Sequence, residues 1–66
     1  MKEKIIEVLR EHPNGLRLRE IAMYLRCNRL AVLSEISELH EEGLIYGRSN
    51  EDHANGEYYI IWALVK

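Results

Sequence analysis

The chain has 66 residues, of which 47% are hydrophobic and 30% charged, and its formal net charge is −2 at pH 7. A chain this short buries only about 60% of the surface that it exposes when unfolded, so we expect one compact domain over residues 1–66. The composition is far from that of disordered proteins, and no apolar run approaches the roughly 20 residues that span a bilayer. Because no basic-then-apolar signal segment opens the chain, the sequence predicts a cytoplasmic protein without a membrane partner.

The first predicted element is a helix over residues 2–11, where apolar side chains recur at helical spacing between lysines and glutamates. Pro13 and the pair Asn14-Gly15 should end this helix, because proline disfavours helix in the residue before it and Asn-Gly readily forms a turn. Leu16 then follows as a brief extended residue.

Two amphipathic helices joined by a very short turn are predicted next. Their apolar stripes are Leu18, Ile21, Ala22 and Leu25 in the first of them and Val32, Ile36 and Leu39 in the second. Arg26 and Cys27 carry the chain through the turn. Asn28 is a good N-cap, since its side-chain oxygen can accept a backbone N–H, and Gly43 should end the last helix in the left-handed conformation.

After Gly43 the period of the apolar pattern falls from about 3.6 to about 2 residues. The segments "LIYGR" and "EYYIIWALVK" are rich in β-branched and aromatic residues, and "SNEDHANG" between them consists of turn formers, so the sequence predicts a β-hairpin with a long tip. One face of the last strand would carry Tyr58, Ile60, Trp62 and Leu64, and the other Tyr59, Ile61, Ala63 and Val65. The alternation leaves open which face covers the helices.

The apolar stripes predict a single core. Its expected members are Ile5, Leu9, Leu18, Ile21, Leu25, Val32, Ile36, Leu39 and Leu44. Four further apolar residues have no place in these stripes, namely Met23, Tyr24, Leu30 and Leu33. We expect them to leave an apolar surface around the second and third helices, and such a patch on a small protein often marks an interface.

Three helices followed by a β-hairpin is the α+β order of a winged helix. The segment "GLRLREIAMYLRCNRLAVLSEISELHEEGLI" resembles, without a gap, the winged helix-turn-helix domain of small prokaryotic transcription regulators. A weaker similarity, over nearly the whole chain, is to the short enterobacterial fimbrial regulators, which also begin with an "MK" helix and end in an aromatic-rich strand. The resemblance implies a helix-turn-helix core with a C-terminal wing, double-stranded DNA as the partner and transcription regulation as the function.

Two positions depart from that family, and both add positive charge. Arg26 occupies a turn position where members commonly have glycine, and Arg17 one where they have threonine or serine. Residues 17–29 contain four arginines and one glutamate, whereas residues 30–47 contain four glutamates and no lysine or arginine. Since the whole chain is negative, any attraction to DNA must be local.

In a helix-turn-helix, the N-terminal part of the second helix enters the major groove. The predicted DNA-binding residues are Arg17, Arg19, Arg26, Asn28, Arg29, Leu30, Leu33, Ser34, Ser37 and Arg48. The arginines would meet phosphates or a base edge, the polar side chains would form hydrogen bonds, and the leucines would touch thymine methyls. For the arginines and serines the alternative is an ordinary solvated surface.

The predicted wing is less well suited to DNA. Arg48 and Lys66 could each hold a flanking phosphate, and Arg48 is the preferred candidate. Glu51, Asp52 and Glu57 lie in the tip or beside it and would repel the minor groove.

The alternative function is a protein–protein interaction module or a dimerising adaptor without DNA binding, because winged helices also bind proteins. Its interface would be the patch of Met23, Tyr24, Leu30 and Leu33, with the acidic helix face giving specificity, or the Trp62 strand. A DNA-binding domain of this size covers one half-site and few phosphates. We therefore expect a homodimer, or action beside a larger DNA-bound protein.

Enzyme, metal and cofactor sites are not expected. His12, His40 and His53 are scattered along the chain and match no metalloprotease or nucleophile motif. Glu35, Glu38, Glu41 and Glu42 are more simply a solubilising helix face than a carboxylate cluster. Cys27 is the chain's one cysteine, so neither an internal disulfide nor a CxxC metal pair can form.

Overall fold

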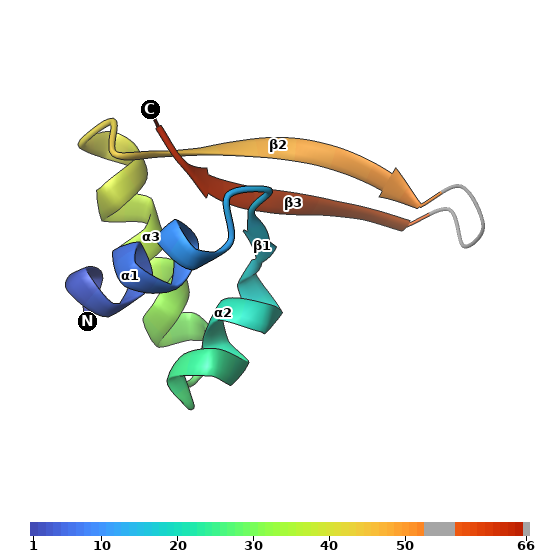
Figure 1. Ribbon diagram of the computed structural model, residues 1–66. Coiled ribbons are helices and arrows are strands. Elements are labelled where there is room, and N and C mark those ends of the chain that lie inside the picture. Colours follow the sequence, from blue (N-terminus) through green and yellow to red (C-terminus); the bar gives the residue numbers. More distant parts are fainter. Residues whose placement is uncertain (53–56, 66) are drawn as a thin grey trace.

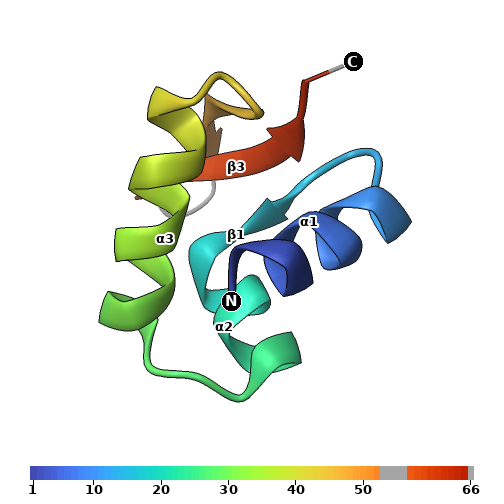
Figure 2. The ribbon, with the colours of Figure 1, turned by 90° about the vertical axis from the view of Figure 1, so that its left-hand side faces the viewer.

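The computed structural model describes residues 1–52 and 57–65. The elements run in the order α1 (Lys2–Glu11), β1 (Leu16–Arg17), α2 (Leu18–Leu25), α3 (Arg29–Glu41), β2 (Ile45–Asp52) and β3 (Glu57–Leu64). The helices lie on one face of a three-stranded antiparallel sheet, and the β2–β3 hairpin extends well beyond them (Figure 1 and Figure 2). This α+β arrangement is compatible with the winged helix expected from the sequence.

The helix ends follow the local signals in the sequence. The side-chain oxygen of Asn28 accepts the Leu30 N–H at 2.7 Å and so caps α3. Gly43 follows α3 with φ +77°, as predicted, and its N–H donates to the His40 carbonyl at 3.0 Å. Because α2 ends at Leu25 and α3 begins at Arg29, the turn between them is only three residues long. This short turn keeps the first turn of α3 close to α2.

The sheet contains one strand more than the predicted hairpin. The brief extended residue expected at Leu16 is part of the two-residue strand β1, which pairs with β3 at Leu16↔Trp62 and Arg17↔Ile61. Strand β3 thus lies at the centre, with β1 on one side and β2 on the other.

Strand β2 is longer than predicted. Residues 49–52, assigned from their composition to the hairpin tip, continue the ladder as far as Asp52↔Glu57. Pairing with β3 outweighs the turn preference of these residues, because strand propensity depends strongly on context. The rest of the predicted tip, residues 53–56 with His53, lies outside the described residues, as does Lys66.

Most of the predicted core is confirmed. The buried cluster consists of Ile5, Leu9, Leu16, Ile21, Ala22, Val32, Ile36, Leu39 and Ile45. Leu18 and Leu25 were expected in it but are only partly buried at its margin. The prediction for Leu44 is wrong, since its side chain is 44% exposed. Leu44 lies in the bend after Gly43, and the next residue, Ile45, begins β2 and takes the buried place.

The structure also decides which face of β3 covers the helices. Trp62 and Leu64 pack against the core, and Ala63 on the opposite face is buried as well. The loop before β1 lies close to that opposite face, because a Cβ atom added to Gly15 would be 3.3 Å from the Ala63 Cβ. Gly15 has φ +91°, a conformation that favours glycine, so this loop can approach the sheet closely.

Candidate nucleic-acid interface

Four arginines surround the start of α3. Arg17 ends β1, Arg19 lies in the first turn of α2, Arg26 lies in the turn after α2, and Arg29 is the first residue of α3. A hollow of about 310 Å³ is lined by Arg19, Ala22, Met23, Arg26, Cys27 and Arg29. We call Arg17, Arg19, Arg26 and Arg29 the basic strip. The structure brings these predicted residues together although they are spread over 13 positions of the sequence.

A second hollow adjoins the basic strip where the hairpin leaves the helical body. It has a volume of about 380 Å³ and is lined by Arg17, Leu18, Arg19, Arg29, Leu33, Tyr59, Ile60 and Trp62. We call it the α3–β3 hollow. Arg19 and Arg29 line both hollows, so the basic strip is continuous from the turn after α2 to the base of the hairpin.

Most of the basic strip has no counter-ion among the residues that the structure describes. Within the part of the chain that the structure describes, Arg19, Arg26 and Arg29 form neither an ion pair nor a side-chain hydrogen bond. Arg17 differs, since its Nε lies 4.0 Å from Glu20 Oε1 and its guanidinium lies 3.9 Å from the centre of the Tyr59 ring. The same Glu20 oxygen accepts the Arg17 backbone N–H at 2.9 Å and caps the start of α2.

Arg26 has an unusual backbone conformation. Its φ of +55° and ψ of +43° place it in the left-handed region, where it ends α2, and its N–H donates to the Met23 carbonyl at 3.2 Å. Residues with a Cβ atom rarely adopt this conformation, whereas glycine does so at little cost. The arginine thus occupies a glycine-type position with an exposed side chain.

The outward face of α3 carries the other predicted groove contacts. Asn28, Ser34 and Ser37 are exposed, and Leu30 is 75% exposed. Leu33 is 40% exposed and belongs to the α3–β3 hollow, so it is turned toward the hairpin. These side chains are thus available to a partner that approaches the first half of α3.

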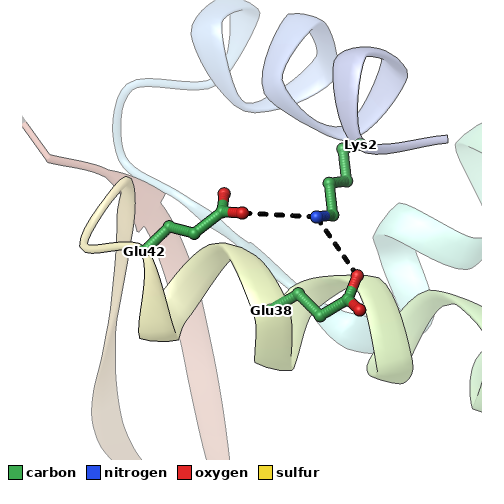
Figure 3. A network of polar contacts seen from close by, with 3 residues as sticks. All are labelled: Lys2, Glu38 and Glu42. Carbon is green, nitrogen blue, oxygen red and sulfur yellow. Dashed lines mark hydrogen bonds and ion pairs between the residues drawn. The ribbon is translucent and has the colours of Figure 1, made fainter.

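Two acidic residues, Glu38 in α3 and Glu42 directly after it, are paired with α1. Lys2 Nζ lies 3.2 Å from Glu38 Oε2 and 3.3 Å from Glu42 Oε1, as Figure 3 shows. These hydrogen bonds, first that to Glu38 and then that to Glu42, raise the pKa of Lys2 above its ordinary 10.5. Both carboxylates therefore lie on the side of α3 that faces α1, while Arg29 and Leu33 lie on the side that faces β3.

Arg48 is not brought to the basic strip. Its Nη2 donates to the Asn14 carbonyl oxygen at 3.0 Å. In the ladder with β3, Gly47 is opposite Trp62 and Arg48 is opposite Ile61, so Arg48 lies on the face of the sheet away from the helices. Sequence spacing could not reveal this separation, because it depends on which face of the hairpin packs on the core.

The apolar surface was only partly predicted. Met23 and Tyr24 are 71% and 58% exposed, as expected. Trp62, proposed as a partner contact, is partly buried against the core, with its ring 5.6 Å from that of His40, and it also lines the α3–β3 hollow. His12 is also less exposed than a free surface residue, since its Nδ1 donates to the Val8 carbonyl at 2.9 Å and its ring lies 5.1 Å from that of Tyr24.

Sequence reasoning missed the contribution of β3 to the site. Tyr59 and Ile60 line the α3–β3 hollow, and Tyr59 stacks with Arg17. Their alternation placed them on opposite faces of a strand but gave no sign that both would border α2 and α3. The short strand β1, which leaves the outer part of β3 uncovered, explains why residues from both faces reach the hollow.

No family model matches this chain, and no curated protein matches it at a significant level. Among the residues placed by the structure, no group of three or more histidine, cysteine, aspartate or glutamate side chains could hold a metal ion. None of the helices in residues 1–52 and 57–65 is long and apolar enough to cross a bilayer.

Proposed function

We propose that this chain is a small DNA-binding regulator of the winged-helix type, which places the first half of α3 in the major groove and holds phosphates with the basic strip. The observation that carries the proposal is the clustering of Arg19, Arg26 and Arg29 around the start of α3 without counter-ions among the residues that the structure describes. Guanidinium groups left free beside a helix N-terminus favour a partner rich in phosphate.

The position of the acidic residues supports the same proposal. A chain of net charge −2 would repel DNA if its negative charge lay around the basic strip. Glu38 and Glu42 are instead directed toward α1, where Lys2 pairs with both (Figure 3). The negative charge of Glu38 and Glu42 thus lies on the α1 side of α3, while Arg29 lies at its start on the side that faces β3. This separation lets a duplex approach the basic side.

A fluorescence anisotropy titration with random-sequence duplex at low salt tests this function. A monomer with three or four phosphate contacts should give a log–log salt slope of about −3, from about 0.9 counterions released per contact. Binding that is absent at low salt, or insensitive to salt, would refute the proposal.

The second candidate function is protein binding, favoured by the exposure of Met23, Tyr24, Leu30 and Leu33. Two single variants separate the candidates. If duplex DNA is the partner, Arg29→Ala should weaken binding by about 1–3 kcal/mol, and Leu33→Ser should have little effect. If a protein is the partner, or a second copy of the chain, Arg29→Ala should be silent and Leu33→Ser should abolish the association.

A further inference from the structure

The α3–β3 hollow is a feature that duplex binding alone does not require. It lies at the inner corner where the hairpin leaves the helical body, and its volume of about 380 Å³ is near the lower end of the range for small-molecule sites, about 300–1,000 Å³. Figure 1 shows the hairpin passing α2 and β1 and continuing beyond them. A small ligand, rather than a large one, therefore fits this corner.

The corner is open because β1 is short. Strand β1 pairs with β3 only at Trp62 and Ile61, after which the chain turns into α2. The next residues of β3, Ile60 and Tyr59, therefore have no strand beside them on the β1 side, and they line the hollow instead.

The lining of the hollow has two chemical halves. One half consists of the guanidinium-bearing residues Arg17, Arg19 and Arg29, and none of the lining residues that the structure describes carries a carboxylate. The other half is apolar or aromatic, with Leu33 from α3 and Ile60 and Trp62 from β3. Arginine forks bind planar carboxylates through two parallel hydrogen bonds, and apolar walls favour a flat hydrophobic body.

We propose that the α3–β3 hollow binds a small aromatic carboxylate. Its carboxylate is held by Arg29 and Arg19, and its ring lies against Leu33, Ile60 and Trp62. The stacking of Arg17 on Tyr59 at 3.9 Å restrains the third guanidinium at the rim of the site. A neutral analogue lacks the charge-assisted hydrogen bonds, so it should bind at least about tenfold more weakly than the carboxylate.

The same arginines belong to the basic strip, so ligand and duplex compete for them. This regulatory part of the inference rests on the proposed function, whereas binding of the carboxylate does not. By linkage, the factor by which the ligand lowers duplex affinity equals the factor by which duplex lowers ligand affinity.

The test uses 2-naphthoate as the probe and 2-naphthamide as its neutral control. Binding is monitored through the ¹H–¹⁵N signal of the indole of Trp62, the chain's one tryptophan. We expect a saturable shift with naphthoate and binding at least about tenfold weaker with naphthamide. Equal binding of the two probes, or no saturable shift with naphthoate, would overturn the proposal.

Paired variants locate the site. Leu33→Glu places a carboxylate in the hollow and should abolish naphthoate binding, while Leu30→Glu makes the same charge change on the same helix outside the hollow and should retain it. Ile60→Glu repeats the test from β3, at a side chain that is also exposed, in case Leu33→Glu alters folding. Equal loss in Leu30→Glu and Leu33→Glu would show that naphthoate binds elsewhere.

A last titration separates the two proposals. Naphthoate added to the duplex complex should raise the apparent dissociation constant of the DNA in proportion to its occupancy. Duplex binding that naphthoate leaves unchanged would contradict the competition. Naphthoate binding in a protein that binds no duplex would refute the DNA-binding function and leave the carboxylate site standing.

Discussion

Arg26 combines an unfavourable backbone conformation with an exposed charge that forms no ion pair within the described part of the chain. Its φ is +55°, and no other described residue except Gly15 and Gly43 has a positive φ. Strained residues are often retained where a function needs their side chain. Within the described residues the side chain of Arg26 has no ion pair or hydrogen bond that would offset the strain. If the chain binds DNA as we propose, a contact with a phosphate accounts for an arginine at this position.

Arg26→Gly should therefore change stability and DNA binding in opposite directions. Release of the left-handed strain should raise the free energy of unfolding by about 0.5–1 kcal/mol, or the Tm by about 2–8 °C. Loss of one phosphate contact should make the salt slope for duplex about one unit shallower. Arg26→Ala is the control, because it removes the charge and keeps the strain, so its Tm should not rise. A lower Tm for Arg26→Gly would contradict this interpretation.

The helices could be predicted from sequence because local chemistry decides where they end. Asn28 as a cap and Gly43 as a stop act within one helical turn. The hairpin was predicted less well, because its length depends on pairing with β3 and not on the turn formers at residues 49–52.

The same distinction holds for the candidate site. The basic strip follows from the spacing of arginines in two linked helices, in the turn between them and in the residue before the first of them. The α3–β3 hollow and the separate position of Arg48 could not be predicted, because both depend on how the hairpin packs.

Helix α3 contributes three residues, Val32, Ile36 and Leu39, to the buried core that the structure describes, and its orientation can be tested by a pair of variants. Leu39 is 1% exposed, so Leu39→Ala should cost about 2–5 kcal/mol. Leu44 is 44% exposed, and Leu44→Ala should cost less than about 1 kcal/mol. Chemical denaturation measures both. Similar losses in the two variants would mean that the bend after Gly43 is placed wrongly.

The contact between α1 and α3 should depend on pH through Lys2. Its folded-state pKa is raised above 10.5, so its hydrogen bonds with Glu38 and Glu42 stabilise the fold fully below that pH and cease to do so as pH rises through the folded-state pKa. The difference in urea midpoint between wild type and Lys2→Gln should be small, since the side chains are exposed, and constant from about pH 7 to about pH 10. It should vanish at higher pH. A difference that persists there would assign the effect to the aliphatic stem of Lys2.

The molecule as a whole measures 34 × 26 × 21 Å, and its longest dimension is about the length of one turn of DNA. If the chain binds DNA as we propose, one copy covers a single half-site, and four arginines alone should bind weakly at cellular salt. We expect tight binding to need a second copy or a neighbouring DNA-bound protein, through the exposed Met23 and Tyr24. Analytical ultracentrifugation with and without duplex checks this. A protein that remains monomeric in both conditions, yet binds one site tightly and specifically at physiological salt, would contradict it.

The most direct measurement of the central claim compares two double variants that lose the same charge. Arg26→Gln with Arg29→Gln removes half of the basic strip, while Lys4→Gln with Arg10→Gln removes two exposed charges from α1. If the basic strip holds phosphates, the first pair should make the salt slope for duplex shallower by about 2, and the second pair should leave it near that of the wild type. Equal changes in the two slopes would show that only net charge matters and would contradict a DNA interface at the start of α3.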